Sequence, residues 1–134
     1  MRIMHQRITI IRERRPVRNL NDELQWLGNS LGLFNLRDKD KSCFRIFIEM
    51  LKAAKVDKPL TSDEIALKLG LTRGTVIHHL NKLMESGIVV HHRNRYMLRV
   101  NNLEMLVQEI KKDAERTFED LGRVAKEIDQ FLGL

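Results

Sequence analysis

Residues 72–85 carry polar side chains on one side of a predicted helix. Apolar residues in this run recur at steps of three or four, which is typical of a helix with one buried face. The opposite face then presents hydroxyl, imidazole and cationic groups. Such groups donate hydrogen bonds to base edges and phosphates, and one arginine can donate two bonds to a guanine. The candidate DNA-contacting residues on this face are Thr72, Arg73, Gly74, Thr75, His78 and Lys82.

A second group of polar residues lies at a predicted hairpin turn. Residues 88–92 and 95–100 have the composition of two short strands, joined by a tight turn at Arg93 and Asn94. Together with Arg95, these side chains would sit at the tip of the hairpin. Guanidinium groups at such a tip can contact the DNA backbone or enter the minor groove.

The elements that position both groups follow one another between residues 60 and 100. Thr61 and Glu64 form a predicted capping box, and Gly70 supplies the left-handed residue for a sharp turn. Thr72 then caps the second helix, which ends at Gly87. A capped helix, a turn, a second helix and a hairpin in this order predict a winged helix-turn-helix.

The segments before residue 60 are predicted with less detail. Residues 2–14 alternate loosely and predict a strand or extended arm, which Pro16 ends. Asn21 can cap a helix that runs to about Leu31, and Gly32 closes it.

A further helix is predicted from Asp38 or Asp40 to about Lys55. Its apolar residues recur at helical spacing and are expected to form a buried face. These residues are Phe44, Phe47, Ile48, Leu51 and Ala54.

Asn101 or Asn102 caps a last helix that is predicted to reach Phe131. Its apolar residues alternate at steps of three and four, which is a heptad seam. A helix of roughly 30 residues is about 45 Å long, more than a small domain can cover, so we expect a second chain to cover much of the seam. The seam consists of Val107, Ile110, Ala114, Thr117, Leu121, Val124, Ile128 and Phe131, and it is widened by Phe118, Ala125 and Leu132.

Composition narrows the class of protein. The chain has 134 residues, a one-domain length, with 43% hydrophobic residues and a net charge of +6. Residues 1–20 hold six arginines against one glutamate, whereas the last helix is acidic. A basic body favours a polyanionic partner. No run is long and apolar enough to span a bilayer, and the single cysteine points to a cytoplasmic location.

Metal and catalytic sites are not expected. The pairs His78-His79 and His91-His92 are adjacent in sequence, so their rings diverge and do not clasp one ion easily. Cys43 lies beside aromatic residues and is expected to be a small buried hydrophobe, with a redox-sensing thiol as the less favoured alternative. The sequence has no phosphate-binding glycine loop and no nucleophile or metalloprotease motif. We therefore expect no enzyme, no metal and no cofactor.

The run LTRGTVIHHLNKLMESGIV resembles the recognition helix of ArsR-type winged-helix transcription regulators, and the resemblance covers roughly residues 60–100. It implies a homodimer on a near-palindromic operator, with the helix from Asn21 and the last helix at the dimer interface. Leu24, Leu27 and Leu31 would then join that interface. Metal-sensing members carry cysteines before the turn or histidines on the last helix, and this chain has neither, so a metal-sensing role is not implied. The matched positions are Thr75, Val76, His78, His79, Leu80, Glu85 and Gly87.

The sequence thus predicts a mainly α protein with a small β wing. It divides into a basic strand or arm (1–18), a winged helix-turn-helix domain (19–100) and a long dimerisation helix (101–134). The favoured function is a homodimeric, sequence-specific regulator of transcription that binds double-stranded DNA, most often a repressor. Two alternatives stay open: a winged-helix module that binds another protein, and an architectural protein that binds DNA without sequence preference.

Overall fold

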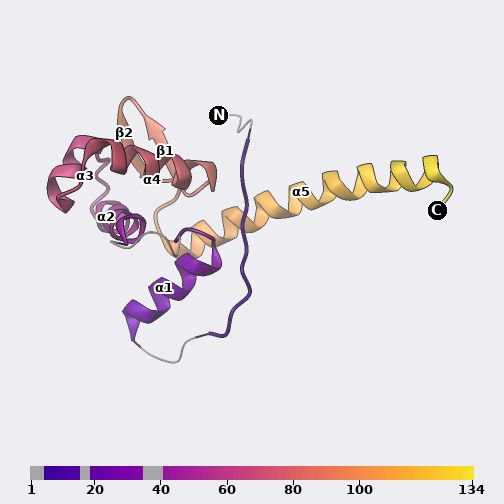
Figure 1. The fold of residues 1–134 in the computed structure, drawn as a ribbon, viewed down its shortest axis with the longest axis horizontal. Helices are drawn as coiled ribbons and strands as arrows, with labels where there is room; N and C mark the ends of the chain where they lie inside the picture. Colours follow the sequence, from indigo (N-terminus) through magenta and orange to yellow (C-terminus); the bar gives the residue numbers. More distant parts are fainter. Residues whose placement is uncertain (1–4, 16–18, 35–40) are drawn as a thin grey trace.

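The computed structural model describes residues 5–15, 19–34 and 41–134 of the chain. It confirms the predicted fold class, with helices, one two-stranded antiparallel sheet and a long last helix that projects from the body (Figure 1). Among the described helices, none is both long enough and apolar enough to cross a membrane. The elements are α1 (Leu20–Ser30), α2 (Ser42–Lys55), α3 (Ser62–Leu69), α4 (Arg73–Glu85), β1 (Val89–His92), β2 (Arg95–Leu98) and α5 (Leu103–Leu132).

Side-chain caps begin α3 and α4 at the two predicted threonines. Thr61 Oγ1 accepts a hydrogen bond from the Glu64 backbone N–H at 3.1 Å, and Thr72 Oγ1 accepts one from the Thr75 N–H at 3.2 Å. The Glu64 carboxylate accepts a bond from the Thr61 hydroxyl at 3.2 Å and not from the Thr61 N–H, so one half of the predicted capping box forms. Gly70, with a φ of +67°, ends α3 in the left-handed region. The predicted helix-turn-helix is therefore confirmed.

The hairpin also forms as predicted. β1 and β2 pair antiparallel with His92 opposite Arg95, which leaves Arg93 and Asn94 as the two turn residues. Both have positive φ, +49° and +66°, as a two-residue turn of the primed type requires. The turn therefore projects two polar side chains from the end of the hairpin.

An isolated backbone bridge joins the hairpin to the start of the helix-turn-helix. The Leu60 N–H donates to the Tyr96 carbonyl at 2.9 Å, and the Tyr96 N–H donates to the Leu60 carbonyl at 2.7 Å. A single hydrophobic core also joins these parts, and it is formed by α2, α3, α4, the sheet and the first turns of α5. Its largest fully buried side chains include Phe47, Leu33, Ile46, Met50, Ile65, Leu80, Leu83, Ile88 and Leu106.

The start of α1 differs from the predicted one. Asn19, not Asn21, caps this helix, because its Oδ1 accepts a hydrogen bond from the Asp22 N–H at 3.0 Å. Asn21 lies within the first turn, where its side chain cannot take that role. Gly32 follows the helix with a φ of +70°, as expected.

The buried face of α2 is turned relative to the predicted one. The helix begins at Ser42, and the predicted start at Asp38 or Asp40 lies outside the described residues. Because α3, α4 and β2 all pack on α2, its buried arc is wide and centres on Cys43, Ile46, Phe47 and Met50. Cys43 is buried, as predicted. The predicted face is confirmed for Phe47, which is fully buried, and for Leu51 and Ala54, which are partly buried and pack against the core. Phe44 and Ile48 are only partly buried and lie at the edge of this arc.

Residues 5–15 form an extended arm, and this described part of the N-terminal segment contains no strand. Of the two predictions for this segment, the strand is therefore wrong and the extended arm is correct. The Arg7 N–H donates to the carbonyl of Glu85, the last residue of α4, and the Ile11 N–H donates to the carbonyl of Ser30, the last residue of α1. The arm thus bonds to the ends of two helices and not to a strand. Residues 1–4 and 16–18 lie outside the described part of the chain.

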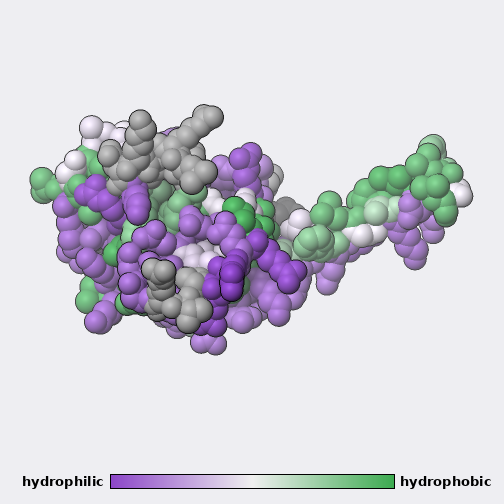
Figure 2. Space-filling view, turned by 60° about the horizontal axis from the view of Figure 1, so that its bottom comes forward, coloured by the Kyte–Doolittle hydropathy of each residue, from purple (hydrophilic) through white to green (hydrophobic). Residues whose placement is uncertain are grey.

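Only the first turns of α5 pack against the body. Asn102 caps the helix through the Met105 N–H at 2.8 Å, and Leu106 and Ile110 enter the core. Every residue from 115 to 134 is exposed. Hydrophobic residues line the projecting part of this helix (Figure 2).

Candidate nucleic-acid interface

The polar side of α4 faces outward. Val76, Leu80 and Leu83 are fully buried and anchor the helix to the core. Because these residues fix one face inward, the candidate DNA-contacting residues lie on the other side. Thr72, Arg73, Gly74 and His78 are exposed, and Thr75 and Lys82 are partly buried.

The first turn of α4 is shaped by its cap. The Thr72 hydroxyl donates to the Thr75 hydroxyl at 2.9 Å while it accepts from the Thr75 N–H. Apart from its chain neighbours and the backbone of α4 itself, no heavy atom lies within 4 Å of the position that a Cβ on Gly74 would take. The start of α4 therefore presents an open backbone beside two hydroxyl groups, a surface that another molecule can approach closely.

Arg73 lies beside an acidic residue of α3. Its Nε is 3.5 Å from Asp63 Oδ1, and the side chains of Arg73 and Asp63 are 63% and 79% exposed. Ion pairs this exposed contribute less than about 1 kcal/mol. The guanidinium can thus exchange the carboxylate for an external acceptor at small cost.

The three polar residues of the hairpin have different surroundings. Arg93 and Asn94 occupy the exposed turn. Arg95 bends back toward α3, where its Nη1 is 3.5 Å from Glu64 Oε1 and 3.4 Å from the Pro59 carbonyl. Arg93 is therefore the cation at the tip, whereas Arg95 lies at the junction between the hairpin and α3.

Three histidines near this surface, His78, His79 and His91, are in contact with other rings. The rings of His78 and His79 lie edge to face, with centroids 5.4 Å apart, and His91 stacks on Tyr96 at 4.4 Å. Among the described residues, no group of three His, Cys, Asp or Glu side chains could hold a metal ion. His78 is the exposed member of its pair and remains a candidate hydrogen-bonding residue.

Polar contacts between α2 and α3 hold the turn motif in place. Lys68 Nζ lies 2.9 Å from the buried Glu49 carboxylate, and Lys52 Nζ lies 3.5 Å from it. Burial favours a higher pKa for Glu49, but the hydrogen bond and charge of Lys68, aided by Lys52, outweigh it and lower the pKa. Arg45 also donates to the Leu69 carbonyl at 2.5 Å, at the end of α3.

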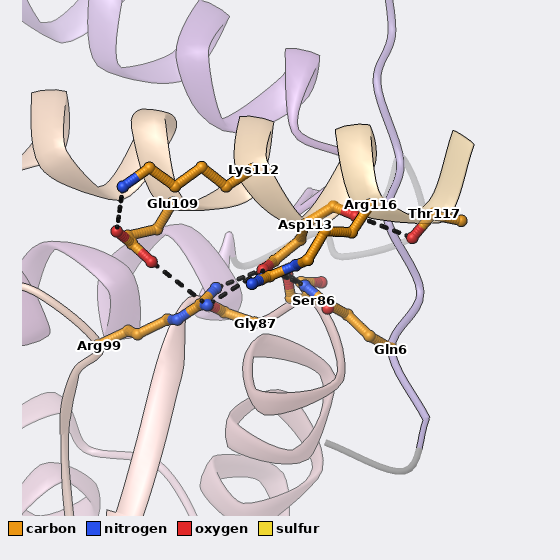
Figure 3. A network of polar contacts seen from close by, with 9 residues as sticks. All are labelled: Gln6, Ser86, Gly87, Arg99, Glu109, Lys112, Asp113, Arg116 and Thr117. Carbon is orange, nitrogen blue, oxygen red and sulfur yellow. Dashed lines mark hydrogen bonds and ion pairs between the residues drawn. The ribbon is translucent and has the colours of Figure 1, made fainter. Parts of the chain in front are cut away.

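A buried polar network joins the body to α5 (Figure 3). Asp113 is only 5% exposed, and its carboxylate accepts from Arg99 at 2.5 and 3.1 Å, from Gln6 at 2.8 Å and from Arg116 at 2.6 Å. Burial favours a higher pKa, but the hydrogen bonds from Arg99, Gln6 and Arg116 lower the pKa of Asp113 to about 2. Asp113 in turn raises the pKa of Arg99 through its hydrogen bond, against the effect of burial. Sequence reasoning missed this network because Gln6 and Asp113 lie 107 positions apart.

The residues predicted to form a dimer interface fall into two groups. Ile110 is buried in the core of its own chain, which removes it from a surface that a partner can reach, and Leu31 also packs against that core. The remaining seam residues of α5 are exposed, apart from the partly buried Ala114. They are Val107, Thr117, Leu121, Val124, Ile128 and Phe131.

The other two predicted interface residues of α1, Leu24 and Leu27, line an open cavity of about 350 Å³. This cavity lies between α1 and the first residue of α5. Its lining is mostly apolar, with one cation and one carboxylate. The lining residues are Arg15, Leu20, Glu23, Leu24, Trp26, Leu27 and Leu103.

The fold and this exposed helix define a winged helix-turn-helix protein. Residues 49–90 match the profile of the family described as bacterial regulatory protein, arsR family. The matched stretch is about a third of the chain and runs from α2 to β1. It confirms the ArsR-type resemblance, and the chain is a DNA-binding regulator of transcription with an ArsR-type helix-turn-helix. No curated protein and no solved structure matches the sequence.

Proposed function

We propose that the protein is a homodimer that binds a specific sequence of double-stranded DNA and represses transcription by occupying a promoter. Residues 19–100 form the DNA-binding domain in this proposal, and residues 101–134 form the dimerisation helix. The main support for this proposal is that the polar side of α4 is exposed beside the hairpin. The hydrophobic core holds α4 and the hairpin in fixed positions.

Each polar residue of α4 has a role that suits its position. Recognition helices contact bases mainly with their first turn. Arg73 is placed to donate two hydrogen bonds to a guanine, and Thr75 and His78 to make single contacts. Thr72 and Lys82, at the two ends of the face, suit phosphate oxygens. The open space beside Gly74 allows the backbone to approach the groove.

The hairpin supplies a second contact in this proposal. Arg93 and Asn94 at the turn reach the phosphate backbone next to the groove that α4 enters. Arg95 reaches DNA only after it leaves Glu64. Because that ion pair is half-exposed, the exchange costs little.

The exposed half of α5 supports the homodimer. Leu121, Val124 and Ile128 are each more than half exposed, although they share one face of the helix with Phe131. Monomeric proteins rarely expose an apolar surface that runs on through several helical turns. Pairing of two α5 helices along this face removes it from water, and symmetric dimers are the most frequent assemblies of identical chains.

An antiparallel arrangement of the two α5 helices accounts for the cavity beside α1. The cavity is lined by Leu103, the first residue of α5, together with Leu24 and Leu27. In an antiparallel pair, the partner brings the end of its own α5, with Phe131 90% exposed, to this position. A parallel pair leaves both the cavity and Phe131 without such a contact. Two recognition helices related by the dimer axis should then lie about 34 Å apart, one turn of DNA.

Two observations favour this function over the alternatives. A module that binds only another protein has no need for the exposed arginines at the hairpin and at the start of α4. An architectural DNA-binding protein needs phosphate contacts only, whereas Arg73, Thr75 and His78 lie where a recognition helix contacts bases.

Selection of preferred sites from random double-stranded DNA, combined with light scattering on the purified protein, tests the proposal. We expect dimers in solution and a near-palindromic site with half-sites about one turn apart. Retention of every sequence with equal affinity would support the architectural alternative. A monomer that ignores DNA even at low salt would support the protein-interaction module and overturn the proposal.

A further inference from the structure

The network around Asp113 connects three parts of the chain that lie far apart in sequence. Gln6 comes from the N-terminal arm, Arg99 follows β2, and Asp113 lies on α5 (Figure 3). Arg99 binds the carboxylate with two nitrogens, and its side chain is only 17% exposed. Two-point contacts of this kind fix orientation as well as distance.

The same donors also hold the end of α4. Gln6 Nε2 lies 3.4 Å from the Ser86 carbonyl, and Arg99 Nη1 lies 3.5 Å from the Gly87 carbonyl. The arm adds a backbone bond from the Arg7 N–H to the Glu85 carbonyl at 3.0 Å. The last residues of the recognition helix and the side of α5 therefore share their hydrogen-bonding partners.

Packing alone defines the direction of α5 poorly. Only its first turns enter the core, and the helix continues as an exposed rod of about 20 further residues. A small rotation at residue 113 would displace the far end by many ångströms, because the helix rises 1.5 Å per residue. Buried ion pairs of this kind often add little net stability, so orientation is the property to which this network is best suited.

We propose that Asp113, Arg99 and Gln6 are positioning residues that fix the angle between α4 and α5. If α5 pairs with a second copy, as proposed above, this angle sets the separation of the two recognition helices. The three residues then select the spacing of half-sites without contacting DNA. This last consequence rests on the proposed homodimer, whereas the fixed angle within one chain does not.

An intrachain distance measurement tests the fixed angle directly. Spin labels at Asn81→Cys on α4 and Lys126→Cys on α5 report the angle, and both positions are exposed. Cys43 is only 1% exposed and stays unlabelled. Dilution with unlabelled protein restricts the signal to pairs within one chain. We expect a narrow distance distribution for the otherwise unchanged protein, and at least a doubling of its width in Asp113→Asn.

Asp120→Asn is the matched control. Asp120 lies one heptad further along the same flank of α5, and within the described part of the chain its carboxylate pairs with the exposed Arg123 at 3.6 Å. Its replacement removes the same charge and should leave the distribution narrow. Equal broadening in both variants would overturn the proposal, because it would assign the effect to charge loss on the helix.

Gln6→Ala gives a second variant in case Asp113→Asn does not fold. It removes one donor and leaves the Arg99 contact with Asp113, so we expect a smaller broadening with an unchanged helix content by circular dichroism. Distributions as narrow as that of the unchanged protein in every folded variant would overturn the proposal.

Binding to paired half-sites tests the consequence for DNA. Asp113→Asn should lose about tenfold in affinity for the preferred spacing and less than about twofold on an isolated half-site. Equal losses on both duplexes would reject the role in spacing. If the unchanged protein is monomeric, the proposed function fails, yet the intrachain distances still decide whether the angle is fixed.

Discussion

Arg73 Nε lies 3.5 Å from Asp63 Oδ1, so the first residue of α4 is paired with a carboxylate of α3. Asp63 itself is 79% exposed and stands beside the surface that we propose for DNA. The acidic group therefore both orients the guanidinium in the absence of DNA and opposes a phosphate that approaches it.

Replacement of Arg73 by alanine should weaken binding to the preferred site by about 1–3 kcal/mol, because a two-bond contact to a base is lost. Binding to random DNA should weaken less. Titration of a labelled preferred duplex and a scrambled one of equal length measures the difference. Asp63→Asn is the companion variant, and we expect it to strengthen binding to both duplexes. An equal loss on both duplexes in Arg73→Ala would mean that Arg73 contacts phosphate only.

Replacement of Arg93 by glutamine should weaken binding to all sequences alike. A phosphate contact contributes about 0.9 to the slope of log affinity against log salt concentration, so the slope should decrease by roughly that amount. Lys126→Gln is the control, because it removes the same charge from the projecting part of α5. A slope that stays unchanged in Arg93→Gln would remove the hairpin tip from the DNA contact.

Gly74→Ala should separate stability from DNA binding. The added methyl group meets no atom within 4 Å beyond its chain neighbours and the backbone of its own helix, and alanine favours a helix over glycine by up to about 1 kcal/mol, so thermal stability should rise. Affinity for DNA should fall because the methyl group occupies the space needed for close approach. Gly122→Ala on α5 also meets no atom within 4 Å and serves as the control, with a gain in stability and unchanged affinity. A Gly74→Ala protein of unchanged affinity would show that α4 does not approach the groove at this residue.

Leu121→Asp should dissociate the proposed dimer. The change removes apolar surface from the exposed face and places a charged carboxylate without a cationic partner in the proposed interface, which should weaken association about 100-fold. Light scattering over a range of concentrations measures the dissociation constant. Lys126→Asp introduces the same side chain away from this face and should leave the mass unchanged. Persistence of the dimer in Leu121→Asp would exclude the α5 face as the interface.

The pKa of Asp113, lowered to about 2, predicts a pH dependence of stability. A carboxylate with a lowered pKa stabilises the fold fully above its ordinary pKa of 3.8, and this contribution is lost as the pH falls toward 2. We expect this contribution to be about 2 kcal/mol at neutral pH. Urea unfolding of the unchanged protein and of Asp113→Asn should therefore converge between about pH 4 and pH 2. A constant difference over that range would contradict the assignment.

Local signals in the sequence were sufficient to predict the turn motif and the hairpin. The caps at Thr61 and Thr72, the left-handed Gly70 and the tight turn at Arg93 and Asn94 are each set by residues within a few positions. Such features follow from backbone hydrogen bonding and allowed dihedral angles, which a single sequence displays directly.

Features that depend on distant parts of the chain could not be predicted in this way. The buried arc of α2 depends on three elements that pack around it, and periodicity alone shifted that face toward Phe44 and Ile48. Nothing near Asp113 in the sequence indicates that Gln6 and Arg99 reach it. The carboxylates of Asp63 and Glu64 beside the candidate DNA-contacting arginines were missed for the same reason, since their pairing depends on how α3, α4 and the hairpin pack.

The backbone bridge between Leu60 and Tyr96 has a consequence for the shape of a bound duplex. It ties the hairpin to the residue that precedes α3, so the hairpin cannot swing independently of the two helices. The distance between the start of α4 and Arg93 is then fixed by the fold. A duplex that contacts both α4 and Arg93 must adapt its groove width and curvature to this fixed distance. Base steps that deform easily between the two contacts are then recognised through their flexibility.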